Sequence, residues 1–280
     1  MFEFNLFHLA FLGQVLLLSG YFPAKLLGQM NFVAENYPPD EYPKLYSRPA
    51  QHYVNSRRRF KLLNAVIFLS GLALLAWFMA STRDLSWDGP RITWFYLLQL
   101  LPVILMDLSL LKEFRLMRLA DSGSRRQAEL KPRRLFDFVS PVLFTFAVAV
   151  YVAFCLFIVY MNQFDYSWFG GYTNIYIITA TNLFLVAIGW RQLRGRKLDP
   201  HQAPEDRRMK IQNILLIMIL TSIAVTLYAG LTITLAALEL RHLQPVTLCL
   251  YFQVLAVITF QAYRIDGRNF EVYRKTPLAG

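Results

Sequence analysis

Residues 138–161 read FVSPVLFTFAVAVYVAFCLFIVYM, an apolar stretch that contains no residue charged at neutral pH. A helix advances about 1.5 Å per residue, so roughly 20 such residues cross the roughly 30 Å hydrocarbon core of a bilayer. Water-soluble folds rarely need an uncharged apolar run of this length. The stretch therefore predicts a transmembrane helix.

The same charge-poor pattern recurs along the whole chain. Seven segments qualify as membrane spans, and they cover residues 6–27, 62–80, 92–111, 138–161, 172–190, 211–238 and 246–263. With 56% apolar and 17% charged residues among 280, the composition excludes a disordered chain. So little chain lies between the segments that we expect residues 1–280 to form a single transmembrane helical domain. The predicted fold class is an all-α, polytopic integral membrane protein.

The first of these segments is the least regular. Polar residues and a proline interrupt it at His8, Gln14, Ser19 and Pro23. A helix that lies in the plane of the membrane surface is therefore the alternative to a span. Small residues recur at helical spacing at Ala10, Gly13 and Gly20, which suits close packing against a neighbouring span. We predict that the segment crosses the membrane.

Basic residues are divided unevenly between the two sides of the predicted bundle. If the loops alternate between sides, all Lys and Arg residues except Arg83, Arg91 and Arg241 fall on the side of the C-terminal tail. Basic loops stay in the cytoplasm when a membrane protein inserts. We therefore predict a protein of the cytoplasmic (inner) membrane with its N-terminus outside and its C-terminus in the cytoplasm.

The predicted cytoplasmic side consists of basic loops and a tail. The loops cover residues 29–60, 112–137 and 191–210, and the tail covers residues 265–280. In a soluble protein a net charge of +11 would suggest nucleic-acid binding. Here the bases lie beside the anionic headgroups of the inner leaflet, which attract Lys and Arg. We expect anionic membrane lipids as partners, and no nucleic acid.

Arginine pairs precede the second, fourth and sixth spans at nearly equal intervals, at Arg58-Arg59, Arg133-Arg134 and Arg207-Arg208. The helices that return across the membrane carry Tyr96, Tyr176 and Tyr251. One N-terminal helix followed by three repeated two-helix hairpins would produce this pattern. The alternative is that cytoplasmic helix ends are basic in any case, and that hairpins of similar length give similar intervals.

An aromatic, proline-rich segment joins the first two spans, where residues 37–49 read YPPDEYPKLYSRP. The prolines exclude a regular helix and favour an extended course. Tyr37, Tyr42 and Tyr46 are expected at the lipid headgroups, where aromatic rings are favoured, or against a partner protein. The three tyrosines are therefore a candidate cytoplasmic partner segment.

Polar side chains within the predicted spans are functional candidates, because such groups are costly in hydrocarbon. Asp107 is the one carboxylate in these segments. It is either a proton or cation site, or it lies near the cytoplasmic surface beside a base such as Lys112. Together with Asn182, Gln253 and Gln261 it would form a narrow polar path through the membrane. Hydrogen bonding between helices is the alternative use of the three amides.

A row of small residues follows one face of the sixth span. Ser222, Thr226 and Gly230 are spaced i, i+4 and i+8, so they lie above one another on a helix. Small side chains let another backbone approach closely. We predict that these three residues form a helix-packing face.

The sequence lacks the signatures of catalytic, metal and cofactor sites. It contains no HExxH, no P-loop, no GxGxxG and no Gly-x-Ser-x-Gly motif. Cys155 and Cys249 form no CxxC pair, and the seventh span has no lysine that would form a Schiff base with retinal. We therefore predict a non-enzymatic protein without catalytic residues, metal or cofactor.

Two functions follow from these patterns. The first is a subunit or scaffold of a larger membrane complex, which packs against other membrane protein subunits through its helix faces. The alternative is a transporter or channel for a small or amphipathic solute, motivated by the repeated spacing and the intramembrane amides. That alternative predicts that Asn182, Gln253 and Gln261 meet in one water-accessible cavity near the middle of the membrane.

Overall fold

The computed structural model describes residues 6–80, 89–120, 133–195, 197–265 and 267–275. The long helices are α1 (Leu6–Val15), the π-helical turn η1 (Leu16–Tyr21), α2 (Phe22–Asn36), α3 (Ala50–Ala80), α4 (Gly89–Ala120), α5 (Pro141–Met161), α6 (Thr173–Arg194), α7 (Pro204–Ala237) and α8 (Gln244–Phe260). Short 3₁₀ turns are η2 (Pro43–Leu45), η4 (Leu135–Asp137), η5 (Arg241–Leu243), η6 (Gln261–Tyr263) and η7 (Glu271–Tyr273).

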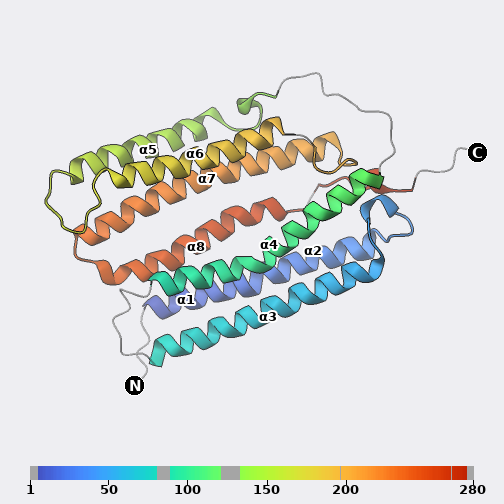
Figure 1. Ribbon diagram of the computed structural model, residues 1–280, viewed down its shortest axis with the longest axis horizontal. Coiled ribbons are helices and arrows are strands. Elements are labelled where there is room, and N and C mark those ends of the chain that lie inside the picture. The colour runs from blue at the N-terminus through green and yellow to red at the C-terminus, as the bar shows by residue number, and fades with distance from the viewer. Residues whose placement is uncertain (1–5, 81–88, 121–132, 196, 266, 276–280) are drawn as a thin grey trace, which may run out of the picture.

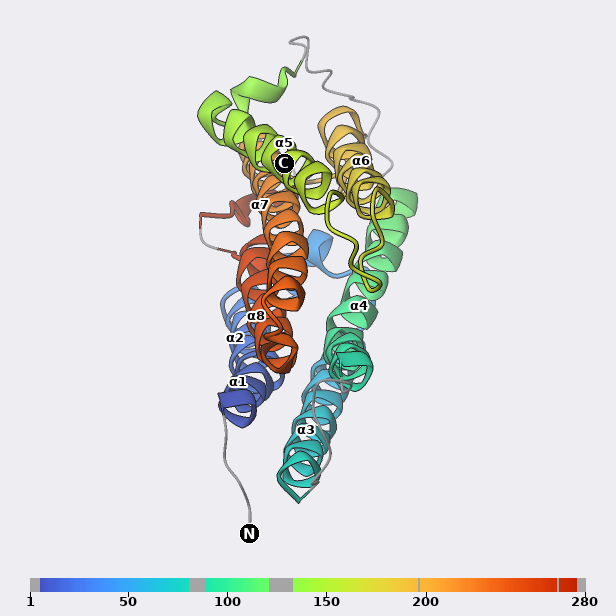
Figure 2. The same cartoon turned by 90° about the vertical axis from the view of Figure 1, so that its left-hand side faces the viewer.

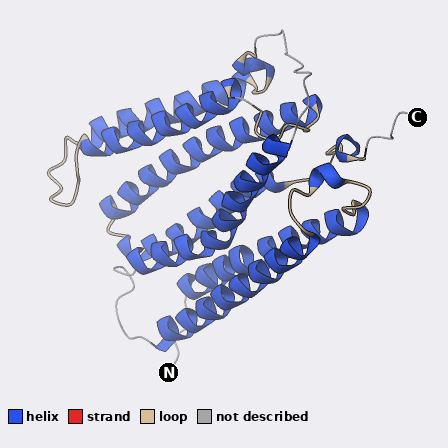
Figure 3. Ribbon diagram, turned by 45° about the vertical axis from the view of Figure 1, so that its right-hand side comes forward, coloured by secondary structure: helices blue, strands red, loops and turns tan. Residues whose placement is uncertain are grey.

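The helices run side by side along the length of the molecule (Figure 1). Helices α1 and α2 join through η1 into one continuous helix, so that the described residues contain seven helices long and apolar enough to cross a membrane. Across the described ranges every regular element is helical and none is a strand (Figure 3). The predicted all-helical fold with seven helices of membrane-spanning length is confirmed.

Several helices extend beyond the predicted apolar limits. Helix α3 begins at Ala50, and α4 continues to Ala120. The predicted loop 29–60 is therefore helical at both of its ends, and only residues 37–49 lie between α2 and α3. An apolar run marks the part of a helix that suits hydrocarbon, whereas the helix itself continues until the backbone is interrupted. Prolines mark two of these limits, because Pro49 precedes α3 and Pro204 opens α7, where a missing N–H is tolerated.

The first segment lies within the bundle and is not a helix apart from it. Phe11 and Val15 have no exposed surface. The small residues that favoured a packed helix do lie at close approaches: the Gln253 amide is beside Gly13, and the Phe68 ring is beside Gly20. Helix α1 therefore packs against α8 and α3, as an inserted helix would.

The contacts between helices divide them into two regions, and Figure 2 shows α5, α6 and α7 above α1, α2 and α3. We call α1 to α4 with α8 the N-terminal bundle, and α5 to α7 the three-helix unit. One continuous apolar core fills the N-terminal bundle, and it includes the stacked rings of Tyr96 and Phe252, whose centroids are 3.9 Å apart. In the three-helix unit, α5 and α6 both pack on α7 and contact each other less. Helices α7 and α8 join the two regions.

The three predicted hairpins use their shared tyrosine in different ways. Tyr96 stacks on Phe252, and Tyr251 stacks on Tyr228 with ring centroids 4.1 Å apart. Tyr176 is 72% exposed. The equal spacing in the sequence therefore corresponds to no common packing of these rings.

One end of the molecule gathers the predicted cytoplasmic segments, and we call it the basic end. There α2, α4, α6 and α8 finish and α3, α5 and α7 begin (Figure 1). At the opposite end lie the turns that connect α5 with α6 and α7 with α8. This arrangement brings residues from distant parts of the sequence together at the basic end.

Candidate functional site

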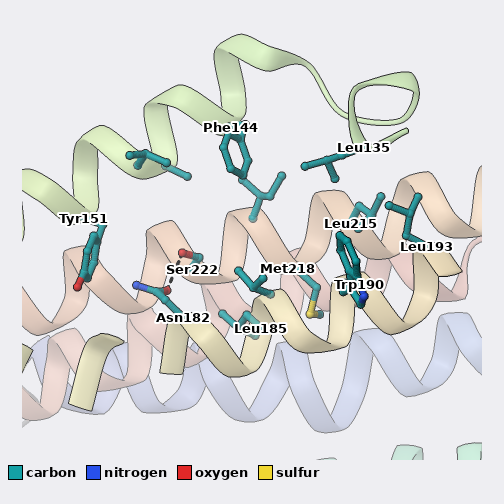
Figure 4. A pocket seen from close by; sticks show the side chains of 15 residues that line it. Leu135, Phe144, Tyr151, Asn182, Leu185, Trp190, Leu193, Leu215, Met218 and Ser222 are labelled. Atoms are coloured by element: carbon teal, nitrogen blue, oxygen red, sulfur yellow. Dashed lines mark hydrogen bonds between the residues drawn. The ribbon is translucent and has the colours of Figure 1, made fainter. Parts of the chain in front are cut away.

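A cavity of about 260 Å³ lies between α5, α6 and α7 (Figure 4). Leu135 and Leu193 line it toward the basic end, and Asn182 and Ser222 line it near the middle of the helices. Most of the remaining wall consists of aliphatic and aromatic side chains. Small-molecule sites commonly measure roughly 300–1,000 Å³, so this pocket suits one slender apolar group.

Small residues explain why the pocket exists. Gly189 lets α6 approach α7 closely, because a Cβ atom at this position would lie 3.2 Å from the Leu215 Cδ2 atom. Ala147 lines the α5 wall and fills little space. Two helices that both pack on α7, with small residues in their facing walls, leave a volume that no side chain of the unit occupies. The pocket is thus a consequence of helix packing and requires no unusual residue.

The polar groups of the pocket bond to one another. The Ser222 hydroxyl donates to the Asn182 Oδ1 atom at 2.7 Å. The Tyr151 hydroxyl lies 2.6 Å from the Thr179 hydroxyl, which itself donates to the Ile175 carbonyl. Because these oxygens are paired, the surface left for a ligand is largely apolar.

Four arginines contact residues near the end of the pocket that faces the basic end. We call Arg133, Arg194, Arg207 and Arg208 the arginine collar. The Arg194 guanidinium lies 3.8 Å from the ring centroid of Trp190, which lines the pocket. The Arg208 guanidinium lies 6.0 Å from the ring of Phe138, which packs in the apolar cluster beside the pocket. Cation–π contacts of this kind hold a guanidinium against an apolar wall and leave its N–H groups available.

The other two arginines of the collar hold the end of α6. Arg133 Nη1 donates to the Leu193 carbonyl at 3.4 Å, and Arg207 Nη2 donates to the Gly195 carbonyl at 2.8 Å. The last carbonyls of a helix have no partner within the helix, and basic side chains satisfy them. Arg133 and Arg207 therefore have a structural role. Among the ion pairs formed by the described residues, none includes Arg194 or Arg208.

The residues of the predicted polar path lie in separate places. Asn182 bonds to Ser222 within the three-helix unit. Gln253 Nε2 donates to the Ala10 carbonyl at 2.9 Å in the N-terminal bundle. The two amides serve contacts between helices, which was the alternative interpretation of them.

The other two residues of the path lie near the basic end. The Tyr263 hydroxyl donates to Asp107 Oδ2 at 2.7 Å, which joins α4 to the end of α8. Gln261 Oε1 accepts from Arg264 at 3.4 Å. No hydrogen bond among the described side chains joins the four residues to one another, so the structure does not bring them into one path.

A buried polar network in the N-terminal bundle was not among the predicted sites. Gln14 Nε2 donates to Gln99 Oε1 at 2.9 Å, and Gln99 Nε2 donates to Ser19 Oγ at 2.9 Å. All three side chains are buried; Ser19 lies in the π-helical turn η1, Gln14 precedes it in α1, and Gln99 is on α4. Hydrogen bonds from i to i+5 place residues five apart above one another. Two polar residues five apart in an apolar segment were therefore the sequence signal for this network.

The predicted packing face of α7 lies against both other helices of the unit. Ser222 bonds to Asn182 of α6, and Thr226 is 2% exposed. A Cβ atom at Gly230 would lie 3.8 Å from the Phe154 Cδ2 atom of α5, an ordinary contact distance. The face therefore contributes to packing within this chain.

The predicted partner segment contacts the C-terminal residues of its own chain. The Tyr42 hydroxyl donates to Glu271 Oε1 at 2.9 Å, and the rings of Tyr37 and Phe270 stack with centroids 4.3 Å apart. Tyr46 donates to the Tyr37 carbonyl at 2.7 Å. The hydrogen bond to Glu271 raises the pKa of Tyr42, and burial raises the pKa of Tyr46. The three tyrosines thus hold residues 37–46 in a defined position.

A buried carboxylate anchors the same segment to α4. Glu113 Oε1 lies 2.9 Å from Arg48 Nε, and Glu113 Oε2 accepts from the Tyr53 hydroxyl at 2.8 Å and from Ser47. Glu113 is 5% exposed. A buried charge needs partners of this kind, so the contact fixes the connection between α2 and α3.

In the part of the chain that the structure covers, no three His, Cys, Asp or Glu side chains lie close enough to hold a metal ion. Comparison with protein-family models, curated proteins and solved structures gives no match to this chain.

Proposed function

We propose that the protein is a non-enzymatic, multi-pass protein of the cytoplasmic (inner) membrane that binds an amphipathic, lipid-like molecule in the pocket between α5, α6 and α7. The observation that supports this proposal is a cavity of about 260 Å³ with largely apolar walls. A polar solute would lose its hydrogen bonds to water in such a cavity, whereas an acyl chain would lose none. The ligand is thus of the amphipathic kind that the predicted transport function would carry. The predicted polar path through the membrane has no part in this function.

The location of the unit supports access from the bilayer. Large apolar side chains on the outer surfaces of α5 and α6 are exposed, among them Val142 at 78%, Leu156 at 66% and Leu183 at 63%. In a membrane these surfaces lie in hydrocarbon, where a lipid chain can reach the pocket without crossing water. The basic end is proposed to face the cytoplasm, in accord with the positive-inside rule.

A role as a subunit of a membrane complex remains the second candidate function. The exposed apolar surfaces suit lipid and a partner helix equally, because lipid tails are as apolar as leucine side chains. The exposed apolar surfaces therefore support the subunit role and the ligand-binding role to the same extent.

The test fills the pocket from the α5 wall. Ala147→Phe places a ring in the cavity, and Ala149→Phe places the same ring on the exposed side of the same helix. Purified protein in detergent is titrated with dioleoylphosphatidylglycerol and examined by native mass spectrometry. We expect Ala147→Phe to lower the bound fraction at least about fivefold, because a filled cavity excludes the chain, and Ala149→Phe to bind as the unmodified protein does.

Thermal unfolding of both variants, followed by circular dichroism, checks that the helices remain intact. If Ala147→Phe folds and binds lipid as well as Ala149→Phe does, the pocket is not the binding site. Absence of lipid binding in the unmodified protein would contradict the proposal directly.

A further inference from the structure

The pocket has the depth of one membrane leaflet. Its wall on α6 extends from Asn182 to Leu193, which at 1.5 Å per residue is about 16 Å. A bilayer has roughly 30 Å of hydrocarbon, so this length is about half of it. One acyl chain of one leaflet therefore matches the pocket, with its outer end at Leu193 and its inner end at the paired hydroxyls and amide.

Two positively charged arginines lie where the headgroup of that lipid would lie. Arg194 is on the ring of Trp190, and Arg208 is on the ring of Phe138, both at the basic end of the pocket. Both arginines are exposed, and within the described ranges no carboxylate pairs with either. A guanidinium binds phosphate oxygens through two parallel N–H groups, and basic pockets between membrane helices bind anionic headgroups in this way.

We infer that the ligand is an anionic phospholipid of the leaflet at the basic end, with one acyl chain in the pocket and its phosphate on Arg194 and Arg208. This inference rests on the proposed function, since it names the headgroup of the molecule whose chain the pocket holds. The arginines of the collar then have two different roles. Arg133 and Arg207 cap the end of α6, and the arginines on the two aromatic rings bind the ligand.

The test removes the two charges and compares headgroups. The double variant Arg194→Gln, Arg208→Gln keeps side chains that reach the surface, and Arg58→Gln, Arg59→Gln on α3 removes the same charge from another exposed arginine pair. The full chain in detergent is titrated by native mass spectrometry with dioleoylphosphatidylglycerol and with dioleoylphosphatidylcholine. Inorganic phosphate is added as a competitor in a third series.

We expect the unmodified protein to bind the anionic lipid at least about fivefold more tightly than the zwitterionic one, because each surface arginine favours an anionic headgroup. The Arg194, Arg208 variant should lose this preference and keep the affinity for dioleoylphosphatidylcholine. The Arg58, Arg59 variant should change both affinities by less than about twofold, since its charges lie away from the pocket.

The remaining outcomes overturn the inference in distinguishable ways. Equal binding of the two lipids, with sensitivity to Ala147→Phe, would reject the anionic headgroup and leave the proposed function intact. Loss of the preference in the Arg58, Arg59 variant would assign it to general surface charge. Complete displacement of the lipid by inorganic phosphate would identify a site for free phosphate. No binding of either lipid would reject the proposed function as well.

Discussion

The N-terminal bundle and the three-helix unit both consist of helices long enough to cross a membrane, but the two regions bury these helices to different extents. In an 18-residue apolar stretch of the first span, Leu6–Asn36, 50% of the residues are buried inside the molecule. In the corresponding stretch of α5 only 11% are buried. The mean hydropathy of these two stretches is 1.4 for the first span and 2.8 for α5. The more apolar of the two helices is thus the less buried one.

This difference shows what apolar character means for a chain in lipid. A helix exposed to hydrocarbon needs an apolar surface all round, while a helix inside the bundle can carry groups such as Gln14 and Ser19 that bond to its neighbours. The N-terminal bundle therefore has the features of a rigid support. The three-helix unit, with separate small cores and a cavity, has those of a ligand-binding region.

The largest expected effect on the free energy of unfolding comes from substituting a glycine in the N-terminal bundle, compared with a glycine in the three-helix unit. At Gly71 in α3, a Cβ atom would lie 2.7 Å from Phe95 Cζ and 2.9 Å from Val15 Cγ2, and both neighbours are buried. Gly71→Ala should lower the free energy of unfolding by about 1–3 kcal/mol, because the packed core must shift. Gly230→Ala in α7 meets only an ordinary contact at 3.8 Å and should be neutral or slightly stabilising. Unfolding in mixed micelles with SDS measures both values, and equal effects would remove the contrast in packing.

A smaller effect is expected from the buried amides. Gln99→Leu removes the partner of both Gln14 and Ser19, which leaves two buried polar groups unpaired. We expect a loss of about 1–2 kcal/mol in the same unfolding assay. Asn182→Leu removes one half-buried hydrogen bond of the three-helix unit and should cost less than about 0.6 kcal/mol. A larger loss for Asn182→Leu would show that the unit, too, depends on its polar groups.

The smallest effect concerns the contact of Tyr42 with Glu271 at the basic end. Its hydrogen bond raises the pKa of Tyr42 above the ordinary value of about 10. The contribution of this bond is therefore complete below about pH 10 and is lost as the pH rises through the raised pKa. Spin labels at positions 44 and 275 should give a narrow distance distribution at pH 8 that broadens above pH 10. Tyr42→Phe should give the broad distribution at both values, and an unchanged distribution at pH 11.5 would show that other contacts hold the tail.

The number and positions of the helices could be predicted because hydrocarbon thickness sets a minimum apolar length. The hydrogen-bond partner of each polar side chain could not be predicted from the sequence. Asn182 and Gln253 were placed within spans, but a span gives the depth of a residue and not the helix that its side chain meets. The network of Gln14, Ser19 and Gln99 depends on a π-helical turn, whose hydrogen bonds differ from the α-helical spacing used to predict faces.

The pocket could not be predicted for a different reason. Its volume comes from small residues such as Ala147 and Gly189, which are ordinary in membrane helices and become informative only when three helices are placed together. The arginine pairs at positions 133–134 and 207–208 were visible in the sequence as marks of helix ends. That Arg133, Arg207 and Arg208 lie at the same end of the three-helix unit as Arg194 follows from the packing of α5 and α6 on α7.

The π-helical turn also limits how the length of the first span can change. Each residue of an α-helix turns the chain by about 100°, and η1 accommodates its residues with a wider turn. Deleting one amino acid between positions 16 and 21 would remove the extra residue of this turn, so an ordinary helix would form with Phe11 and Gln14 in nearly the same orientation relative to α2. In α5, which has no such turn, a one-residue deletion would rotate one part of the helix by about 100° relative to the other and would turn Ala147 or Phe154 away from its contacts. A one-residue deletion is therefore tolerated best at η1, where the extra residue lies, and least in helices where packed side chains must keep their angular register.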